Sequence, residues 1–134
     1  MVIDTSAIAA ILFQEPEAIE FATAIEVDPI RLISTVTALE TMIIVEARKG
    51  QAGAREVDLL FHKAKLDIVP FSKEQVEIAR QAWQKYGKGK HPAALNFGDC
   101  FTYALAKTSQ ESLLFKGNDF HKTDIKLVFF NVNH

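Results

Sequence analysis

The 134-residue chain contains one cysteine, no long apolar run and no excess of positive charge. Because Cys100 is alone, it can form neither an intramolecular disulfide nor a zinc site that needs a second thiol, which favours a reducing, cytoplasmic setting. No apolar stretch approaches the roughly 20 residues that cross a bilayer, and the start, Met1-Val2-Ile3-Asp4, lacks the features of a secretion signal. We therefore expect a soluble cytoplasmic protein with no membrane attachment.

The formal net charge of -2 provides no general attraction to a polyanion. Any binding to nucleic acid must therefore come from a local basic patch. The length, with 49% hydrophobic residues, suits one buried core. Because no internal repeat, low-complexity tract or linker interrupts the sequence, we expect a single domain over residues 1–134.

Short apolar segments alternate with longer stretches that have the periodicity of amphipathic helices. This alternation is typical of an α/β protein, in which helices cover both faces of a mainly parallel sheet. We therefore predict a three-layer α/β/α sandwich with a mainly parallel central sheet of short strands. The predicted strands are residues 1–3, 31–34, 67–71, 113–115 and 127–130. The predicted helices begin near residues 4, 16, 37, 51, 72 and 96, and the third is expected to end at Gly50.

Four acidic residues lie where predicted strands give way to helices or turns. Asp4 follows the first strand, and Glu40 opens the helix after the second. Asp99 opens the helix after a glycine-rich loop, and Asp119 follows the strand at 113–115. In an open parallel sheet such junctions lie along the carboxyl edge, where ligands bind, so we expect these acids to converge.

Carboxylates that are pressed together repel one another and destabilise the fold unless a cation neutralises them. Ligation by oxygen alone favours Mg²⁺ or Mn²⁺, and the sequence has no His/Cys cluster with zinc spacing. A divalent ion at these acids could activate water and stabilise the charge that develops on a phosphoryl group during hydrolysis. The predicted metal-binding and catalytic residues are Asp4, Glu40, Asp99 and Asp119.

Each acid, taken alone, also has a structural explanation. Asp4 can cap a helix, and Asp119 can stabilise a turn. Residues 37–40 have the Thr-x-x-Glu spacing of a capping box, and Asp99 can partner an Asn96 cap in the same way. The sequence leaves these alternatives open.

Four segments carry recognisable motifs: Val2-Ile3-Asp4-Thr5-Ser6-Ala7, Thr37-Ala38-Leu39-Glu40, Lys88-Gly89-Lys90-His91-Pro92-Ala93-Ala94-Leu95-Asn96-Phe97-Gly98-Asp99-Cys100 and Leu113-Leu114-Phe115-Lys116-Gly117-Asn118-Asp119-Phe120. Together they resemble the VapC branch of the PIN-domain ribonucleases. They occur in order across essentially the whole chain, and the third segment is the most specific.

The resemblance implies a PIN-like fold and a metal-dependent endoribonuclease that hydrolyses single-stranded or looped RNA. It maps Asp4, Glu40 and Asp99 onto the metal site, with Asp119 as the fourth acid. Related proteins often have two adjacent acids where this chain has Asn118-Asp119, so the number of metal ions stays open. It further implies a homodimer, and inhibition by a VapB-like antitoxin whose tail blocks the acidic groove.

Residues close to these acids are candidates for substrate binding. Thr5 and Ser6 can hydrogen-bond a carboxylate or the substrate, although helix capping explains them equally well. Lys88, Lys90 and His91 precede the third acid and can hold RNA phosphates, or they can simply face solvent. This loop lacks the Gly-x4-Gly-Lys-Ser/Thr spacing of a nucleotide-binding P-loop.

Aromatic residues in the second half of the chain could stack on bases. Because they occur at helical spacing, packing in the core or at an interface is the better explanation. These residues are Trp83, Tyr86, Phe97 and Tyr103.

Two other functional classes compete with a nuclease. A phosphatase of the haloacid type or a phosphate-receiver domain also has an aspartate after its first strand. The first is expected to show Asp-x-Asp and the second an adjacent acid pair, whereas this chain has Asp4-Thr5-Ser6. The remaining alternative is a catalytically weak PIN-like module that binds RNA or protein, and retention of Asp4, Glu40 and Asp99 argues against it.

Overall fold

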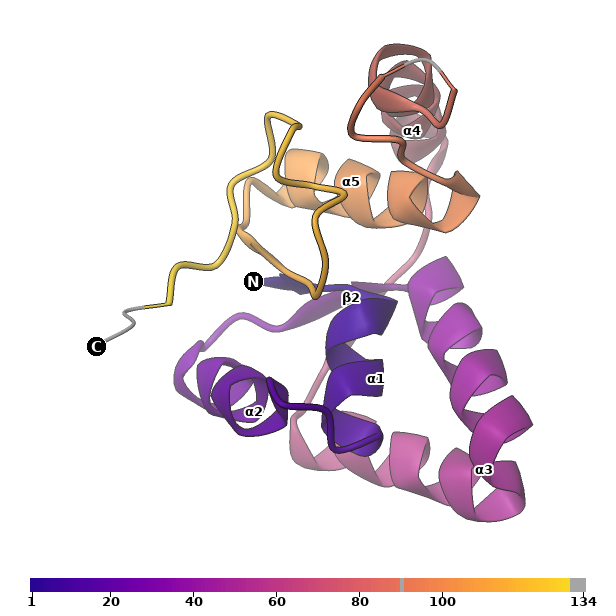
Figure 1. Ribbon diagram of the computed structural model, residues 1–134, viewed down its shortest axis with the longest axis vertical. Helices are drawn as coiled ribbons and strands as arrows, with labels where there is room; N and C mark the ends of the chain where they lie inside the picture. Colours follow the sequence, from indigo (N-terminus) through magenta and orange to yellow (C-terminus); the bar gives the residue numbers. More distant parts are fainter. Residues whose placement is uncertain (90, 131–134) are drawn as a thin grey trace.

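A four-stranded parallel sheet lies at the centre of the computed structural model, which describes residues 1–89 and 91–130 (Figure 1). The strand order is β3-β2-β1-β4, and each neighbouring pair is parallel. All four carboxyl ends therefore lie along one edge of the sheet. The strands are β1 (Val2–Ile3), β2 (Leu32–Ser34), β3 (Asp67–Val69) and β4 (Leu113–Leu114).

Helices cover both faces of this sheet. Those of the described residues are α1 (Thr5–Leu12), α2 (Ala18–Val27), α3 (Thr35–Lys63), α4 (Lys73–Tyr86) and α5 (Phe97–Ser109). Figure 1 shows α1, α2 and α3 on one side of the sheet and α5 with α4 on the other. α5 packs against β1 and β2, and α4 packs against α5. The predicted α/β/α sandwich with a parallel sheet is confirmed.

Successive strand residues point to opposite faces of the sheet, as the pleat requires. Val2 and Leu113 belong to a core cluster on the side of α4 and α5, whereas Ile3 and Leu114 belong to a second cluster beneath α1, α2 and α3. All four side chains are almost completely buried. The short strands are therefore apolar throughout because both of their faces are covered.

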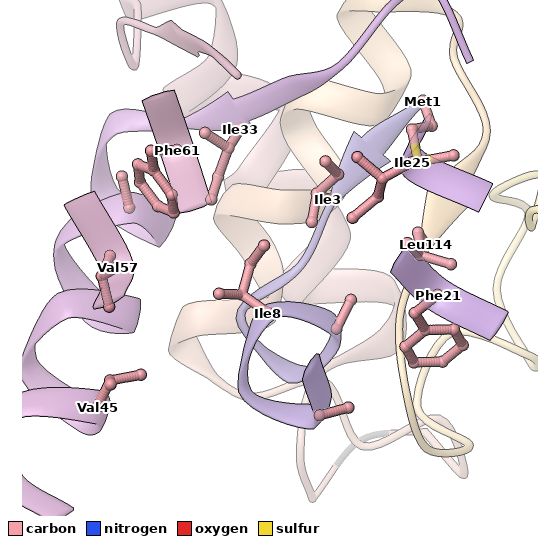
Figure 2. Close-up of a cluster of buried hydrophobic side chains, with 13 residues drawn as sticks. Met1, Ile3, Ile8, Phe21, Ile25, Ile33, Val45, Val57, Phe61 and Leu114 are labelled. Atoms are coloured by element: carbon pink, nitrogen blue, oxygen red, sulfur yellow. The ribbon is translucent and has the colours of Figure 1, made fainter. Parts of the chain in front are cut away.

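The second cluster packs the sheet against α1, α2 and α3 (Figure 2). Ile3, Ile8 and Ile33 are fully enclosed, and each stabilises the fold by about 1.5–3 kcal/mol relative to an exposed side chain. α1 and α3 begin directly after β1 and β2, which are neighbouring strands, and the two helices also pack against each other. This packing brings the residues after β1 and β2 to one place.

The long helix after β2 differs from the predictions at both ends. α3 begins at Thr35 with Ser34 as its N-cap, so the predicted capping box of residues 37–40 is wrong. The helix also continues past Gly50, whose φ of 65° and ψ of -153° produce a kink. The two predicted helical segments are the two arms of this kinked helix.

The fifth predicted strand, residues 127–130, is wrong. Leu127 forms an isolated parallel bridge with Leu113, and the Val128 N–H donates to the Leu113 carbonyl at 2.9 Å. The segment therefore pairs with β4 at one residue only and forms no strand, and Phe129 is 87% exposed. In the part of the chain that the structure describes, no helix combines the length and the apolar character needed to span a membrane.

Candidate active site

Four acidic side chains line one cavity of about 280 Å³, hereafter the acidic cavity. Asp4 follows β1, and Glu40 lies in the second turn of α3. Asp99 lies in the first turn of α5, and Asp119 follows β4. The parallel sheet thus brings together acids that are up to 115 positions apart, counted from 4 to 119.

Asp4 is a buried residue whose two carboxylate oxygens both accept hydrogen bonds. Oδ2 accepts from the Ser6 backbone N–H at 3.1 Å and from the Ser6 hydroxyl at 2.6 Å, which makes Asp4 the N-cap of α1. Oδ1 accepts from the Thr102 hydroxyl of α5 at 2.8 Å. Asp4 therefore caps α1 and also lines the acidic cavity, and these hydrogen bonds fix the orientation of its carboxylate.

Glu40 is held by α1 on one side and by α5 on the other. Its Oε1 accepts a hydrogen bond from the Thr5 hydroxyl at 2.7 Å. A Cβ added to Gly98 would lie 2.6 Å from Oε2, so only glycine leaves room for this carboxylate in its present position. Glu40 therefore faces the acidic cavity and does not cap its own helix.

Buried threonine hydroxyls connect these two acids. Thr41 donates to the Thr5 hydroxyl at 3.0 Å, and Thr37 and Thr102 share a hydrogen bond at 3.3 Å. The network thus joins α1, α3 and α5 behind the carboxylates. Sequence reasoning named Thr5 and missed the other three. Thr102 could have been found because it lies three positions after Asp99, on the same face of a helix.

Asp99 has a capping role and an unusual charge environment. It forms a capping box with Asn96, in which each side chain accepts from the other residue's backbone N–H, at 2.9 and 3.0 Å. Burial raises the pKa of Asp99 to about 7, and the charges of Asp4 and Asp119 add to this effect, against the hydrogen bond from Asn96. The three aspartates therefore interact as one acidic cluster.

Asp119 is the most exposed of the four acids. It lies in the turn after β4, just beyond Gly117, whose φ of 118° is readily adopted only by glycine. A side-chain hydrogen bond with Asp119 also contributes to the raised pKa of Asp99. Asp119 is thus part of the site, but it is the acid that the fold holds least firmly.

Residues 1–126 match the family model of the PIN domain. The chain belongs to the PIN-domain family. Over 128 residues it is 54% identical to ribonuclease VapC30 of Mycobacterium tuberculosis. The aligned region covers 96% of this chain and 98% of that protein.

Solved structures show the same fold. The crystal structure of VapC20 of Mycobacterium tuberculosis, a sarcin-ricin loop cleaving toxin, superposes with a TM-score of 0.76 at 15% identity. The match covers 95% of this chain and 97% of that one. A chain of VapBC2 from Rickettsia felis, solved with a DNA fragment from its promoter, superposes with a TM-score of 0.72 at 15% identity. The match covers 97% of this chain and 98% of that one. The predicted resemblance to VapC proteins of the PIN family is confirmed.

The donor set of this PIN domain fits a hard divalent cation. The four carboxylates supply only oxygen ligands, as Mg²⁺ and Mn²⁺ prefer. A cation would offset the burial and the neighbouring negative charges that together raise the pKa of Asp99. Within residues 1–89 and 91–130, however, no three acidic, histidine or cysteine side chains are already grouped closely enough to hold an ion. A Mg²⁺ ion, which proteins often hold through one or two carboxylates and several waters, would still fit this donor set.

Lys88 and His91, two of the predicted basic residues, do not line the acidic cavity of the PIN domain. Lys88 lines a different cavity, of about 510 Å³, together with Trp83 and Phe97. The Nδ1 atom of His91 accepts from the Ala93 backbone N–H at 3.0 Å. Lys90 lies outside the described residues.

A positively charged side chain, that of Lys116, does line the acidic cavity of the PIN domain, and sequence reasoning missed it. Its position two residues after β4, among residues that lead to Asp119, was the available signal. Ser6 lies close by, since its hydroxyl accepts from the Lys116 backbone N–H at 2.9 Å. Thr5 and Ser6, predicted as possible substrate contacts, both bond to site carboxylates.

The aromatic residues of the PIN domain divide into two groups. Tyr86 and Tyr103 are buried, as their interpretation as core residues requires. Trp83 is 45% exposed and Phe97 is 79% exposed, so core packing does not explain them. Phe97 also lines a third cavity with Leu39 of α3, which leaves an apolar surface beside the acids.

Proposed function

We propose that this protein is an endoribonuclease that hydrolyses RNA phosphodiester bonds with Mg²⁺ or Mn²⁺, and that it acts as the toxin of a VapBC-type pair. One observation carries the proposal: Asp4, Glu40, Asp99 and Asp119 line a single cavity. The cavity belongs to a chain that is 54% identical to a VapC ribonuclease. We place the activity in the cytoplasm, where its RNA substrate is, and assign it to one PIN domain formed by residues 1–134.

In this proposal, Asp4 and Asp99 hold the metal ion most directly, and Glu40 and Asp119 complete the site. The bound cation supplies activation of water and stabilisation of the charge that develops on the phosphate. Ser6 and Thr102 keep both oxygens of Asp4 oriented, and Thr5 does the same for Glu40.

Glu40 is the acid assigned to proton removal from the attacking water. Its carboxylate is partly exposed, faces the cavity and is fixed by one hydrogen bond from Thr5. A carboxylate in this position can accept a proton over a hydrogen-bond distance. Asp99 is buried and lines the same cavity, where an ion would keep it charged.

We further propose a homodimer formed through the apolar surface beside the acidic cavity. Leu39, Ile43 and Phe97 are each more than half exposed and surround a cavity of about 340 Å³. Large exposed apolar patches of this kind mark interaction surfaces. A second copy of this chain would bury the surface and bring two acidic cavities near one another.

The other protein partner is a VapB-like antitoxin, as in the VapBC2 complex of Rickettsia felis. Its chain is proposed to cover the acidic cavity and so exclude RNA. Positively charged residues on the antitoxin would match the four carboxylates. Release of the antitoxin then frees the toxin to act.

The test is cleavage of a mixed RNA pool by antitoxin-free protein in Mg²⁺, in Mn²⁺ and in a chelator. Wild type is compared with Asp99→Asn, and with Asp58→Asn as a matched change on the exposed face of α3. We expect cleavage that requires metal, survives Asp58→Asn and is lost in Asp99→Asn. RNA binding without cleavage by folded, metal-loaded wild type would instead favour the catalytically weak binding module.

A further inference from the structure

The acidic cavity presents an electrostatic problem for an RNA substrate. Four carboxylates line it, and RNA brings a negative charge with every phosphate. Among the described residues that line this cavity, Lys116 is the only lysine or arginine. Its position therefore decides how a phosphate can approach the acids.

The backbone of Lys116 is fixed to the acidic site. Its N–H donates to the Ser6 hydroxyl at 2.9 Å, and that hydroxyl donates to Asp4 at 2.6 Å. The start of the lysine side chain is thus held at a constant place relative to the carboxylates. The long side chain beyond it can still change direction without disturbing the strand.

The ammonium group of Lys116 is held by two other acids that do not line the acidic cavity. Nζ lies 2.8 Å from Glu15 Oε2 and 3.0 Å from Glu17 Oε2. Both glutamates belong to the segment between α1 and α2, and all three side chains are about one-third exposed. Partly exposed ion pairs are weak, so an incoming phosphate can exchange first with the carboxylate of Glu15, whereas the Oε2 atom of Glu17 is buried.

A neighbouring cavity meets the acidic cavity at the same lysine. This neighbouring cavity, of about 400 Å³, shares Phe115 and Lys116 with the acidic cavity. It is also lined by Asn118 and His121, and by two acids, Glu17 and Glu20. Phe115 and His121 lie edge to face, with ring centroids 5.3 Å apart. Lys116 therefore lies at the boundary between the four acids and a cavity lined by aromatic, polar and acidic groups, and it is the only lysine or arginine among the described residues that line either one.

We infer that Lys116 binds a phosphate of the RNA next to the cleaved bond, and that Glu15 and Glu17 hold its ammonium group until RNA replaces them. This inference rests on the proposed function of the acidic cavity. It assigns the RNA path to the side of β4 and of the segment between α1 and α2. Lys88 lines a different cavity and is not required for this contact.

The test measures binding of a fluorescein-labelled single-stranded RNA of mixed sequence, in Ca²⁺ in place of Mg²⁺ so that cleavage is slow. We expect Lys116→Met to weaken binding about tenfold, as for loss of one charge-assisted hydrogen bond. The slope of log K against log salt should also fall by about 0.7, the value for one phosphate of a single strand. Lys63→Met, at the end of α3 that leads into the start of β3, is the control and should change neither quantity.

A double-mutant cycle separates this role from a structural one. Glu15→Gln with Glu17→Gln releases the lysine, so binding should become a few-fold tighter even though two ion pairs are lost. In the Lys116→Met background the same pair of changes should increase the affinity for RNA by a clearly smaller factor. An equal gain in both backgrounds, or an unchanged salt slope in Lys116→Met, overturns the inference.

The two proposals fail in different ways. If wild type cleaves RNA with metal while Lys116→Met keeps the wild-type salt slope, the function stands and the role of Lys116 falls. If wild type binds RNA but never cleaves it, the nuclease proposal falls, and the salt slope still reports whether Lys116 contacts a phosphate.

Discussion

Gly98 lies directly against the carboxylate of Glu40: a Cβ at position 98 would be 2.6 Å from Oε2 and 3.3 Å from Cδ. The two residues come from different helices, α5 and α3. The absence of a side chain at the start of α5 therefore sets the position of an acid that belongs to α3. This contact can be tested without changing any acidic residue.

Gly98→Ala should reduce RNA cleavage while it preserves the fold. The new methyl group forces the flexible end of Glu40 to rotate, and a displacement of about 1 Å in a catalytic group can lower kcat/KM roughly 100-fold. The stability should change little, because the better helix propensity of alanine offsets the loss of the Thr5–Glu40 hydrogen bond, each being about 1 kcal/mol. Cleavage kinetics and urea unfolding measure the two effects.

Gly53→Ala is the matched control for this prediction. Its Cβ would lie 2.7 Å from Lys49 Cβ and 2.9 Å from the Val45 carbonyl oxygen, far from the acids. We expect this variant to lose stability by about 1–3 kcal/mol through overpacking and to keep its activity per folded molecule. Full cleavage by Gly98→Ala would show that Glu40 is not needed at its present position.

Thr102→Val should weaken both the fold and metal binding. The change keeps the shape of the side chain but removes the hydroxyl that donates to Asp4 Oδ1 at 2.8 Å and contacts Thr37 at 3.3 Å. Loss of a buried bond to a charged group costs about 1–3 kcal/mol. Urea unfolding and calorimetric titration with Mn²⁺ measure the two losses.

Thr102→Ser distinguishes the hydrogen bond from packing. Serine retains the donor and loses only a methyl group, so it should restore most of the metal affinity even if some stability is lost. Equal metal affinities for the serine and valine variants would mean that the hydroxyl does not orient Asp4.

The convergence of the acids could be expected from the sequence because it depends on few facts. Apolar segments separated by helices require parallel strands, and parallel strands place the residues that follow them on one edge. Asp4 and Asp119 follow β1 and β4, which are neighbours in the sheet. No knowledge of helix packing was needed to bring these two together.

The partners of the acids could not be expected, because they depend on how the helices pack. Thr102 reaches Asp4 only because α5 crosses β1, and Glu40 meets Gly98 only because α3 lies beside α5. The local Thr-x-x-Glu pattern predicted a cap, whereas Thr37 bonds to Thr102 and Glu40 bonds to Thr5. Tertiary contacts thus displaced the local capping interaction.

The stability of the metal-free protein should fall as the pH rises through the range set by Asp99. Its pKa is about 7 in the fold, against an ordinary value of 3.8, because burial and the charges of Asp4 and Asp119 disfavour its ionised form. The folded state then binds more protons than the unfolded state between about pH 4 and pH 7, so this contribution is lost as pH rises. Three pKa units set an upper limit of about 4 kcal/mol, and we expect about 1–3 kcal/mol.

Asp99→Asn should remove this pH dependence and stabilise the metal-free protein at pH 8. Asp124 provides a control of opposite sign, because its bonds from Lys107 and Tyr103 lower its pKa although burial alone would raise it. Asp124→Asn should therefore destabilise the protein at pH 8. Urea unfolding in a chelator from pH 5 to pH 8 measures both, and added Mn²⁺ should stabilise wild type but not Asp99→Asn. A wild-type stability that does not change with pH would contradict this account of Asp99.

The apolar surface around Phe97 should control assembly. Phe97→Ser together with Ile43→Ser removes two exposed apolar side chains that line the cavity of about 340 Å³. In a two-fold dimer each change occurs twice, so the dissociation constant should rise at least about 100-fold. Sedimentation at several concentrations should show a dimer for wild type and a folded monomer for the variant.

Phe129→Ser is the control for this prediction. Phe129 is 87% exposed but does not line this cavity, so the variant should remain dimeric. A monomeric wild type at tens of micromolar would instead assign the surface to the antitoxin, and addition of that partner should then protect Phe97 from solvent.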